Sequence, residues 1–190
     1  MTRTDAQRNL QALLEAAKAV FATSGVDAPA KEITDRAGVG VGTLYRHFPR
    51  RSDLVIAVLE REIDACADAG AALSAANPPS VALAKWIRRY CDFVLTKVGL
   101  ASALHAADGL RAYFYERMSP VVEALLAAAA GEVRADVDAR DVLHAVALLC
   151  HPVPGEDADY GRRLVDVFID GLRPARGPLA AGSPAGRAGR

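Results

Sequence analysis

Residues 30–48 of this chain read AKEITDRAGVGVGTLYRHF, and this stretch decides how the N-terminal part folds. Apolar side chains stand at helical spacing on both sides of a glycine-rich centre, with Ile33 before it and Leu44 and Phe48 after it. Gly38 stands where the first helix must end, and glycine adopts the left-handed backbone of such an end without steric cost. The pattern predicts two short helices joined by a tight turn, which is a helix-turn-helix.

The second of these helices carries polar side chains suited to nucleic acid. They are hydroxyl, phenol, guanidinium and imidazole groups, at Thr43, Tyr45, Arg46 and His47. All four hydrogen-bond phosphates or base edges in protein–DNA complexes. Because the second helix of a helix-turn-helix enters the major groove, the sequence predicts a DNA-binding surface here.

The segment AGVGVGTLYRHFPRRSDL, residues 37–54, closely resembles the DNA-binding domain of the TetR family of transcriptional regulators. In that family the helix after the turn reads G-T-L-Y-x-[HY]-F, which this chain matches from Gly42 to Phe48. Leu54 matches the first apolar position of the next helix. The resemblance is specific over residues 10–59 and only architectural beyond them. It implies an all-helical protein with an N-terminal three-helix helix-turn-helix head and a C-terminal ligand-binding and dimerisation body.

The chain departs from the family pattern at three helix starts. Gly40 replaces a Ser or Thr, so the second helix lacks a capping hydroxyl. Arg50 and Arg51 replace a Ser-Lys or Asn-Lys pair, which keeps positive charge and adds a bidentate fork. Pro29 stands close to the position of a capping Thr, and Asp27 is a candidate substitute cap.

The resemblance implies a DNA-contacting role for each of the polar residues after the turn. Thr43, Tyr45 and His47 are expected to bind chiefly phosphate, although Tyr45 also has the alternative of packing on its own helix. Arg46 is the better candidate for a bidentate contact with a guanine edge. Gly42 is expected to let the helix backbone approach the DNA closely.

Three further cations are candidates for phosphate contacts that fix the docking register. Lys31 lies near the start of the first helix of the motif, and Arg51 lies at the start of the helix after it. Arg50 either binds phosphate in the same way or is solvated, and the sequence does not separate the two.

Charge is balanced overall but uneven along the chain. Lys plus Arg and Asp plus Glu number 23 each among the 190 residues. Residues 1–52 hold eight basic and five acidic residues, an excess of three positive charges. A locally basic end on a neutral protein is typical of a modest DNA-binding head.

The chain shows no targeting or membrane signal. The N-terminal residues lack the apolar core of a signal peptide, and no apolar run reaches membrane-spanning length. Three cysteines at wide and irregular spacing, Cys66, Cys91 and Cys150, favour a reducing compartment over a disulfide framework. We therefore expect a cytoplasmic protein.

Beyond residue 50 the apolar pattern is helical throughout. It predicts helices at residues 51–74, 80–98, 100–107, 110–134, 138–150 and 157–172. Pro120 is expected to kink the fourth of these or to restart it. The predicted domains are a DNA-binding domain at 1–50, a helical ligand-binding and dimerisation domain at 51–173, and a disordered tail at 174–190.

In members of the TetR family the body encloses a pocket for a small molecule. The resemblance makes aromatic, histidine and methionine side chains of the body the candidate ligand contacts, namely Trp86, Tyr90, Phe93, His105, Tyr113, Phe114, Met118 and His144. Aromatic residues at helical spacing are usually packing residues, so many of these are equally expected in the core. The consecutive aromatic residues 113–115 point in different directions on a helix, and at least one should face a cavity, a partner or solvent.

The two last predicted helices have broad apolar faces. By analogy with the family they are expected to form a four-helix interface with a second copy of the chain. The residues assigned to this interface are Val142, Val146, Leu149, Leu164, Val165, Phe168 and Ile169.

No pattern for metal binding or catalysis stands out. Cys150 and His151 are adjacent and cannot share one face of a helix, and there is no HxxxH or CxxC pair. The sequence also contains no nucleophile elbow, no phosphate-binding loop and no dinucleotide-binding fingerprint. We therefore expect no metal, no cofactor and no enzymatic activity.

The function predicted from the sequence is that of a homodimeric repressor, which binds a palindromic DNA operator and is released by a small-molecule effector. One alternative is a ligand-independent or activating regulator on the same fold. Another, of a different class, is a small-molecule-binding protein or enzyme with a vestigial DNA-binding head.

Overall fold

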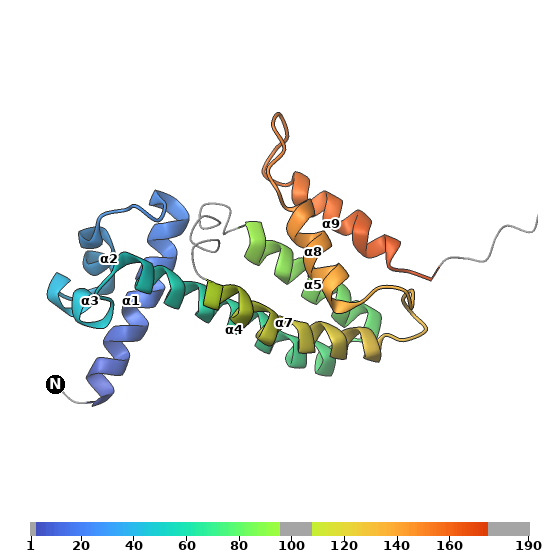
Figure 1. Ribbon diagram of the computed structural model, residues 1–190, viewed down its shortest axis with the longest axis horizontal. Coiled ribbons are helices and arrows are strands. Elements are labelled where there is room, and N and C mark those ends of the chain that lie inside the picture. Colours follow the sequence, from blue (N-terminus) through green and yellow to red (C-terminus); the bar gives the residue numbers. More distant parts are fainter. Residues whose placement is uncertain (1–2, 96–107, 175–190) are drawn as a thin grey trace, which may run out of the picture.

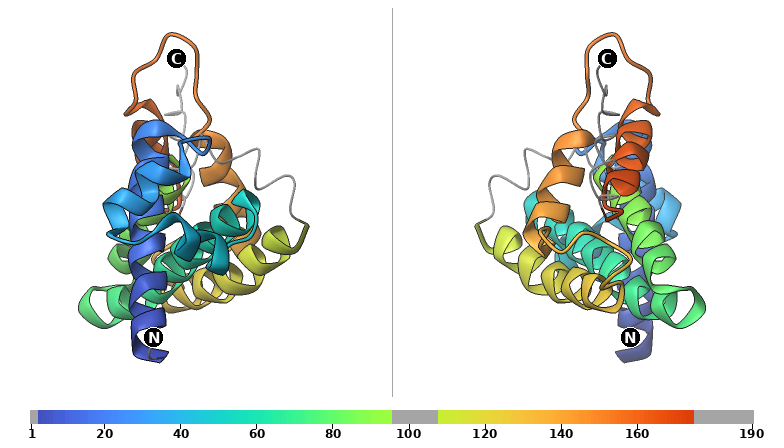
Figure 2. Two further views of the ribbon diagram at one scale, coloured as in Figure 1. Left: turned by 90° about the vertical axis from the view of Figure 1, so that its left-hand side faces the viewer. Right: turned by 90° about the vertical axis from the view of Figure 1, so that its right-hand side faces the viewer.

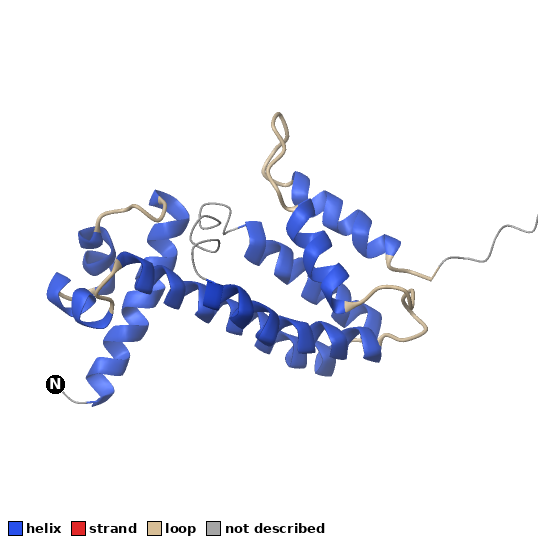
Figure 3. Cartoon of the chain, viewed as in Figure 1, coloured by secondary structure: helices blue, strands red, loops and turns tan. Residues whose placement is uncertain are grey.

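The computed structural model describes residues 3–95 and 108–174, and every regular element in these residues is a helix (Figure 3). This confirms the all-helical class. Among the helices that the structure describes, none is both long and apolar enough to cross a membrane.

The N-terminal head consists of α1 (Arg3–Ser24), α2 (Ala30–Ala37) and α3 (Val41–His47), which lie together at one end of the molecule (Figure 1). Leu13, Ile33 and Leu44 each come from one of these helices and are buried in the shared core. Gly38 ends α2 at φ 68° and ψ 30°, which confirms the left-handed turn predicted there.

The long helix α4 (Arg51–Ala76) starts in the head and continues into the body (Figure 1). There it packs between α5 (Pro79–Leu95) and α7 (Asp108–Ala128). Its packing with α7 is close at Gly70, where an added Cβ would overlap the Cγ1 atom of Val121. α4 is therefore the mechanical link between the two parts of the chain.

The body is completed by α8 (Ala139–Leu149) and α9 (Tyr160–Gly171), which pack on α5 and on each other. Asp138 caps α8, because its side chain accepts a hydrogen bond from the backbone N–H of Asp141 at 2.8 Å. The connection at residues 150–159 projects from the body and is visible at the top of both views of Figure 2.

Several predicted helix boundaries differ from those observed. The helix predicted at 110–134 runs from Asp108 to Ala128, and it continues through Pro120 without a restart. The chain turns at Gly131, which has φ 86°, so the segment after Ala128 is not helical. The last helix begins three residues later than predicted, at Tyr160.

The cap predicted for α2 is wrong. The N-cap residue is Pro29, whose side chain offers no acceptor, and no side-chain cap is present. Asp27 stands three residues before the first helical residue, too far away for a cap. The helix predicted at 100–107 and the tail after Pro174 lie outside the described residues.

Candidate nucleic-acid interface

α3 lies at the outer end of the head (Figure 1) and presents one buried and one exposed face. Leu44 and Phe48 are 3% and 7% exposed and anchor the helix on the core. The opposite face carries the exposed side chains of Tyr45 and Arg46, and Tyr45 is 52% exposed. About half of this side chain is therefore open to a partner.

The start of α3 is open as well. A Cβ atom added to Gly40 or Gly42 would meet no atom within 4 Å, and neither glycine has a positive φ. The protein's own packing and backbone therefore do not require glycine at either position. Gly40 is the N-cap and makes no side-chain cap, as expected from the missing hydroxyl.

Thr43 and His47 lie at the edge of this exposed face. Both side chains are half-buried, and the imidazole of His47 packs at 6.3 Å from the ring of Phe48. The backbone N–H of Thr43 donates to the carbonyl of Gly40 at 2.8 Å in the first turn of the helix.

Lys31 lies in the first turn of α2 and is exposed. Its ammonium group pairs with the carboxylate of Asp35 at 2.6 Å, and both side chains are largely in solvent. An exposed pair of this kind contributes little stability and exchanges readily for another anion.

Arg50 caps the start of α4 together with Asp53. The carboxylate of Asp53 accepts hydrogen bonds from the backbone N–H of Arg50 at 3.0 Å and from its guanidinium at 3.1 Å. These bonds hold the pKa of Asp53 below its ordinary value. The Arg50 side chain remains 79% exposed, so its charge still faces solvent.

Arg51 has a structural role that the sequence analysis missed. Its Nε and Nη2 atoms both donate to the carbonyl oxygen of Val26, at 2.8 and 2.6 Å, and its guanidinium lies 5.0 Å from the centre of the Phe21 ring. Arg51 therefore ties the start of α4 to the α1–α2 connection. Its partner lies 25 residues earlier, so no local pattern could have revealed the bond.

Two ion pairs fix α1 on α4. Lys18 contacts Glu62 at 2.8 Å, and Arg61 contacts Glu15 at 2.6 Å. Together with the Arg51 bond they make the orientation of the head depend on α4.

Three of the residues predicted to contact a ligand are fully packed inside the body. Trp86 and Met118 are 0% exposed and Tyr90 is 2% exposed. The indole N–H of Trp86 donates to the carbonyl of Cys66 at 3.0 Å, and the hydroxyl of Tyr90 donates to the carbonyl of Leu143 at 3.1 Å. In this conformation these side chains are core residues.

The other predicted ligand residues are more open. Phe93 and Phe114 are half-buried, and each ring centre lies 6.0 Å from that of Tyr90; Phe93 is stacked on Tyr90 and Phe114 is tilted against it. His144 is exposed, and its Nε2 atom is hydrogen-bonded to the hydroxyl of Tyr115 at 2.7 Å. The last, His105, lies outside the described residues.

Tyr113 and Arg117 connect α7 to α4. The Tyr113 hydroxyl and the Arg117 guanidinium both donate to the carboxylate of Asp64 at 2.7 Å, and Arg117 also reaches Asp68 at 3.0 Å. The bond to Asp64 raises the pKa of Tyr113. The role of Tyr113 in the described part of the chain is therefore to join two helices.

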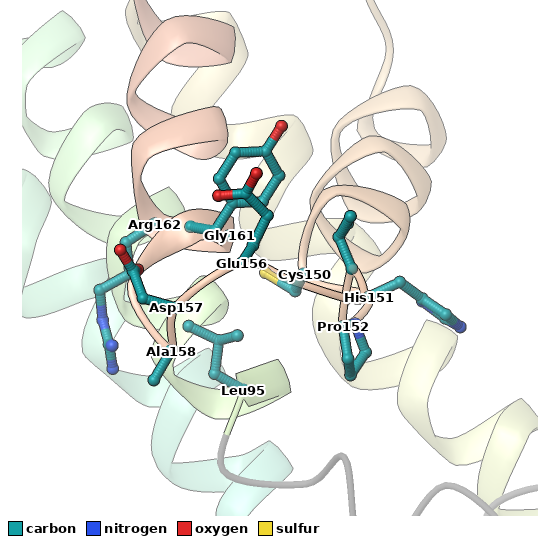
Figure 4. Close-up of a pocket in the computed structure, with 11 residues that line it drawn as sticks. Leu95, Cys150, His151, Pro152, Glu156, Asp157, Ala158, Gly161 and Arg162 are labelled. Atoms are coloured by element: carbon teal, nitrogen blue, oxygen red, sulfur yellow. The ribbon is translucent and has the colours of Figure 1, made fainter.

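Two of the cavities in the described part of the body lie near its last helices. One of about 370 Å³ lies at the base of the α8–α9 connection, beside Cys150 and Gly161 (Figure 4). The other, of about 510 Å³, lies between Ser80, Glu132 and the end of α9. None of the predicted ligand residues within 3–95 and 108–174 lines either cavity.

The predicted dimer residues divide into two groups. Val142, Val146 and Val165 are at most 1% exposed and fill the core of the protomer, so their side chains do not form its surface. Helical periodicity does not distinguish a core-facing stripe from a partner-facing one, so the assignment of these three residues to an interface stays a prediction. Half-buried positions are Leu149, Leu164, Phe168 and Ile169.

The most exposed apolar residues of these two helices are not among the predicted dimer residues. Leu148 on α8 and Val167 on α9 are each 70% exposed. Leu148 is adjacent to the half-buried Leu149, and Val167 is adjacent to the half-buried Phe168. Only the structure shows that Leu148 and Val167 themselves face solvent.

Two family models match the chain. Residues 13–58 match the model of bacterial regulatory proteins of the tetR family, and residues 78–174 match that of the C-terminal domain of SbtR-like transcriptional regulators. The second match alone spans about half of the chain.

Solved structures of TetR regulators resemble the whole chain. One from Streptomyces coelicolor is 36% identical, with a TM-score of 0.70 over 87% of this chain and 99% of that one. One from Mycobacterium vanbaalenii is 39% identical, with a TM-score of 0.67 over 90% and 98%. LfrR from Mycobacterium smegmatis, solved in complex with proflavine, is 26% identical, with a TM-score of 0.62 over 87% and 94%.

Curated relatives match a shorter stretch. A helix-turn-helix-type transcriptional regulator of Staphylococcus aureus is 41% identical over 63 residues, which is about a third of this chain and of that protein. The full-length structural matches and the two family models agree with the head and body described above. The chain belongs to the TetR family of transcriptional regulators.

Proposed function

We propose that this protein is a homodimeric, cytoplasmic repressor that binds a palindromic operator and leaves it when a small molecule enters the body. The observation that carries the proposal is the exposed face of α3, where Tyr45 and Arg46 project from a helix anchored by Leu44 and Phe48. This face belongs to a head whose family binds DNA.

On the operator, the exposed face of α3 lies in the major groove. Arg46 reads a guanine edge, while Thr43, Tyr45 and His47 contact phosphates. The open start of α3 at Gly42 brings the helix backbone close to the DNA. Lys31 leaves its exposed partner Asp35 for phosphate, an exchange that costs little because such pairs are weak. The side chain of Arg50 is 79% exposed and contributes positive charge at the same surface.

A second copy of the chain supplies the second recognition helix. Leu148 and Val167 expose apolar surface on α8 and α9, and burying it against a symmetry mate favours association. Two heads on one rigid body bind two half-sites about one DNA turn apart, which raises affinity through avidity.

Release follows from the coupling between α7 and α4. The Asp64 carboxylate ties α7 to the helix that also holds the head through Arg51 and Lys18. A ligand that favours a different packing of α7 therefore favours a different head orientation. The loss of operator affinity is limited by the ratio of the ligand's affinities for the two conformations. The complex of the related LfrR with proflavine supports an apolar or partly aromatic ligand.

The direct test is DNA binding by fluorescence anisotropy, first on fragments from beside the protein's own gene and at two salt concentrations. We expect a palindromic site that binds two protomers with a Kd of roughly 10⁻⁸ M or tighter and weakens steeply with salt. The Tyr45→Ala/Arg46→Ala double variant should bind at least about fivefold more weakly, because it loses the roughly 1–3 kcal/mol of one bidentate base contact. Arg173→Ala, which removes an exposed charge at the far end of α9, is the control and should bind normally.

Equal binding by the double variant and wild type would overturn the role of α3 and favour a vestigial head. For the ligand, proflavine is the first probe, added to the preformed complex with a set of smaller aromatic compounds. A rise in Kd supports release by ligand. Operator binding that no compound changes favours the ligand-independent regulator.

A further inference from the structure

Two of the three cysteines meet inside the body. Cys91 lies on α5 and Cys150 at the end of α8, and their Sγ atoms are 3.3 Å apart although 59 residues separate them along the chain. Both residues are buried, at 1% and 2% exposed, and both are free thiols. From this geometry we propose that Cys91 and Cys150 form a reversible disulfide when peroxide reaches the body, so that the pair is an oxidation site.

A route for the oxidant lies beside the pair. Cys150 lines the cavity of about 370 Å³ at the base of the α8–α9 connection (Figure 4). This volume exceeds the roughly 30 Å³ that a water molecule occupies in the liquid, so it admits hydrogen peroxide. The Cα atom of Cys150 packs against the start of α9, where a Cβ added to Gly161 would lie 3.3 Å from it. Glycine at this position thus allows the start of α9 to approach the backbone of α8 closely at Leu149 and Cys150.

The two sulfurs have different chemical characters. The thiol of Cys150 donates its hydrogen to the sulfur of Cys91, which lowers the pKa of Cys91 and raises that of Cys150. Arg162 lowers the pKa of Cys91 further, while burial and the carboxylates of Asp92 and Asp166 act against the shift. The thiolate is the nucleophile, so these shifts favour attack by Cys91, whose sulfur lies 3.3 Å from that of Cys150 at the cavity wall.

The reaction balances with hydrogen peroxide as the only oxidant. The Cys91 thiolate attacks one peroxide oxygen, the O–O bond breaks, and a sulfenic acid forms while the departing hydroxide takes up the thiol proton as water. The sulfur of Cys150 then attacks the Cys91 sulfur and displaces hydroxide, which takes the Cys150 proton and leaves as a second water. Two thiols are oxidised to one disulfide, and an external dithiol reverses the change.

The crosslink should be visible as a gain in stability. A disulfide between α5 and α8 closes a loop of 59 residues in the unfolded chain, which is a large constraint on that state. We therefore expect the Tm of the oxidised protein to rise by at least about 5 °C, reversed by dithiothreitol. This outcome does not depend on whether the protein binds DNA.

The experiment treats the reduced full-length protein with a small molar excess of hydrogen peroxide. Trypsin separates the three cysteines into peptides 62–85, 90–97 and 141–162. We expect a disulfide link between the peptides of Cys91 and Cys150. On a non-reducing gel the oxidised protein should run as a single chain, which shows that the link is within one protomer. Cys66, buried to the same extent on α4, should remain a titratable thiol.

Matched variants keep the test decisive even if a substitution lowers stability, because each variant is compared with itself before and after peroxide. Cys66→Ser should retain both the link and the rise in Tm, whereas Cys150→Ser should lose both. A link that involves Cys66 or joins two chains would overturn the proposal, as would oxidation only in denaturant. Equal changes in Tm for Cys150→Ser and wild type would also overturn it.

Discussion

Two glycines inside helices, Gly42 in the head and Gly70 in the body, are present for opposite reasons. Around Gly42 on α3 nothing lies within 4 Å of an added Cβ. Around Gly70 on α4 the Cγ1 of Val121 occupies that position, and the Trp86 ring lies 3.7 Å from it. Glycine weakens a helix by about 0.5–1 kcal/mol relative to alanine, so each position offsets this cost in its own way.

At Gly70 the compensation lies within the protein, because the missing side chain lets α7 approach α4 over the indole of Trp86. At Gly42 no neighbouring atom of the described protein compensates for the cost of glycine. A glycine that the fold does not require is expected at a surface that a partner approaches closely, and under the proposed function this partner is DNA. Under this proposal, glycine at position 42 is explained by DNA binding, and glycine at position 70 is explained by packing within the body.

The largest effect on stability is expected from Gly70→Ala. Overpacking costs about 1–3 kcal/mol, and the better helix propensity of alanine returns about 0.5–1 kcal/mol. The net loss of up to about 2 kcal/mol should lower the Tm by several degrees in thermal unfolding followed by circular dichroism.

The Val121→Ala background isolates the cause of that loss. Removing the Cγ1 atom makes room for the new methyl group, so Gly70→Ala should there be neutral or stabilising. An equal loss in both backgrounds would show that the contact with Val121 is not the reason for glycine at position 70.

The head was largely predictable because its signals are local. Gly38 follows its helix directly, and Leu44 and Phe48 stand four residues apart, so turn and buried face can both be read from neighbouring residues. The bond from Arg51 to Val26 was not predictable, since it joins residues 25 positions apart and belongs to no sequence motif.

The body was predictable as helices but not as a surface. Periodicity marked Val142 and Val165 as apolar positions, yet whether such a stripe meets the core or a partner depends on how the helices are arranged. The contact between Cys91 and Cys150 depends in the same way on the packing of α5 against α8. The wide and irregular spacing of the cysteines in the sequence did not predict this contact.

Gly42→Ala should separate stability from binding in the head. With open space and a negative φ, alanine should raise the free energy of unfolding by about 0.5–1 kcal/mol. The same methyl group on the DNA-facing helix should weaken operator binding roughly tenfold, about 1.4 kcal/mol. Thermal unfolding and anisotropy on one preparation measure both changes. Unchanged affinity in a stabilised variant would show that DNA does not approach the backbone of α3 at this position.

The smallest effect is expected from Gly40→Ser at the N-cap of α3. The backbone there already has the extended conformation of a cap, with φ −75° and ψ 149°, and the added side chain meets no neighbour. A serine hydroxyl accepts a hydrogen bond from the first turn, which should add a few tenths of a kcal/mol relative to glycine. Gly40→Ala provides the same backbone restriction without the acceptor, so urea unfolding of the two variants isolates the cap itself. If the alanine variant is as stable as the serine variant, the gain comes from the unfolded chain, and the α3 start needs no hydroxyl. If Gly40→Ser also binds the operator normally while Gly42→Ala does not, then of these two glycines only Gly42 is required for DNA binding, because the backbone of α3 approaches the DNA there.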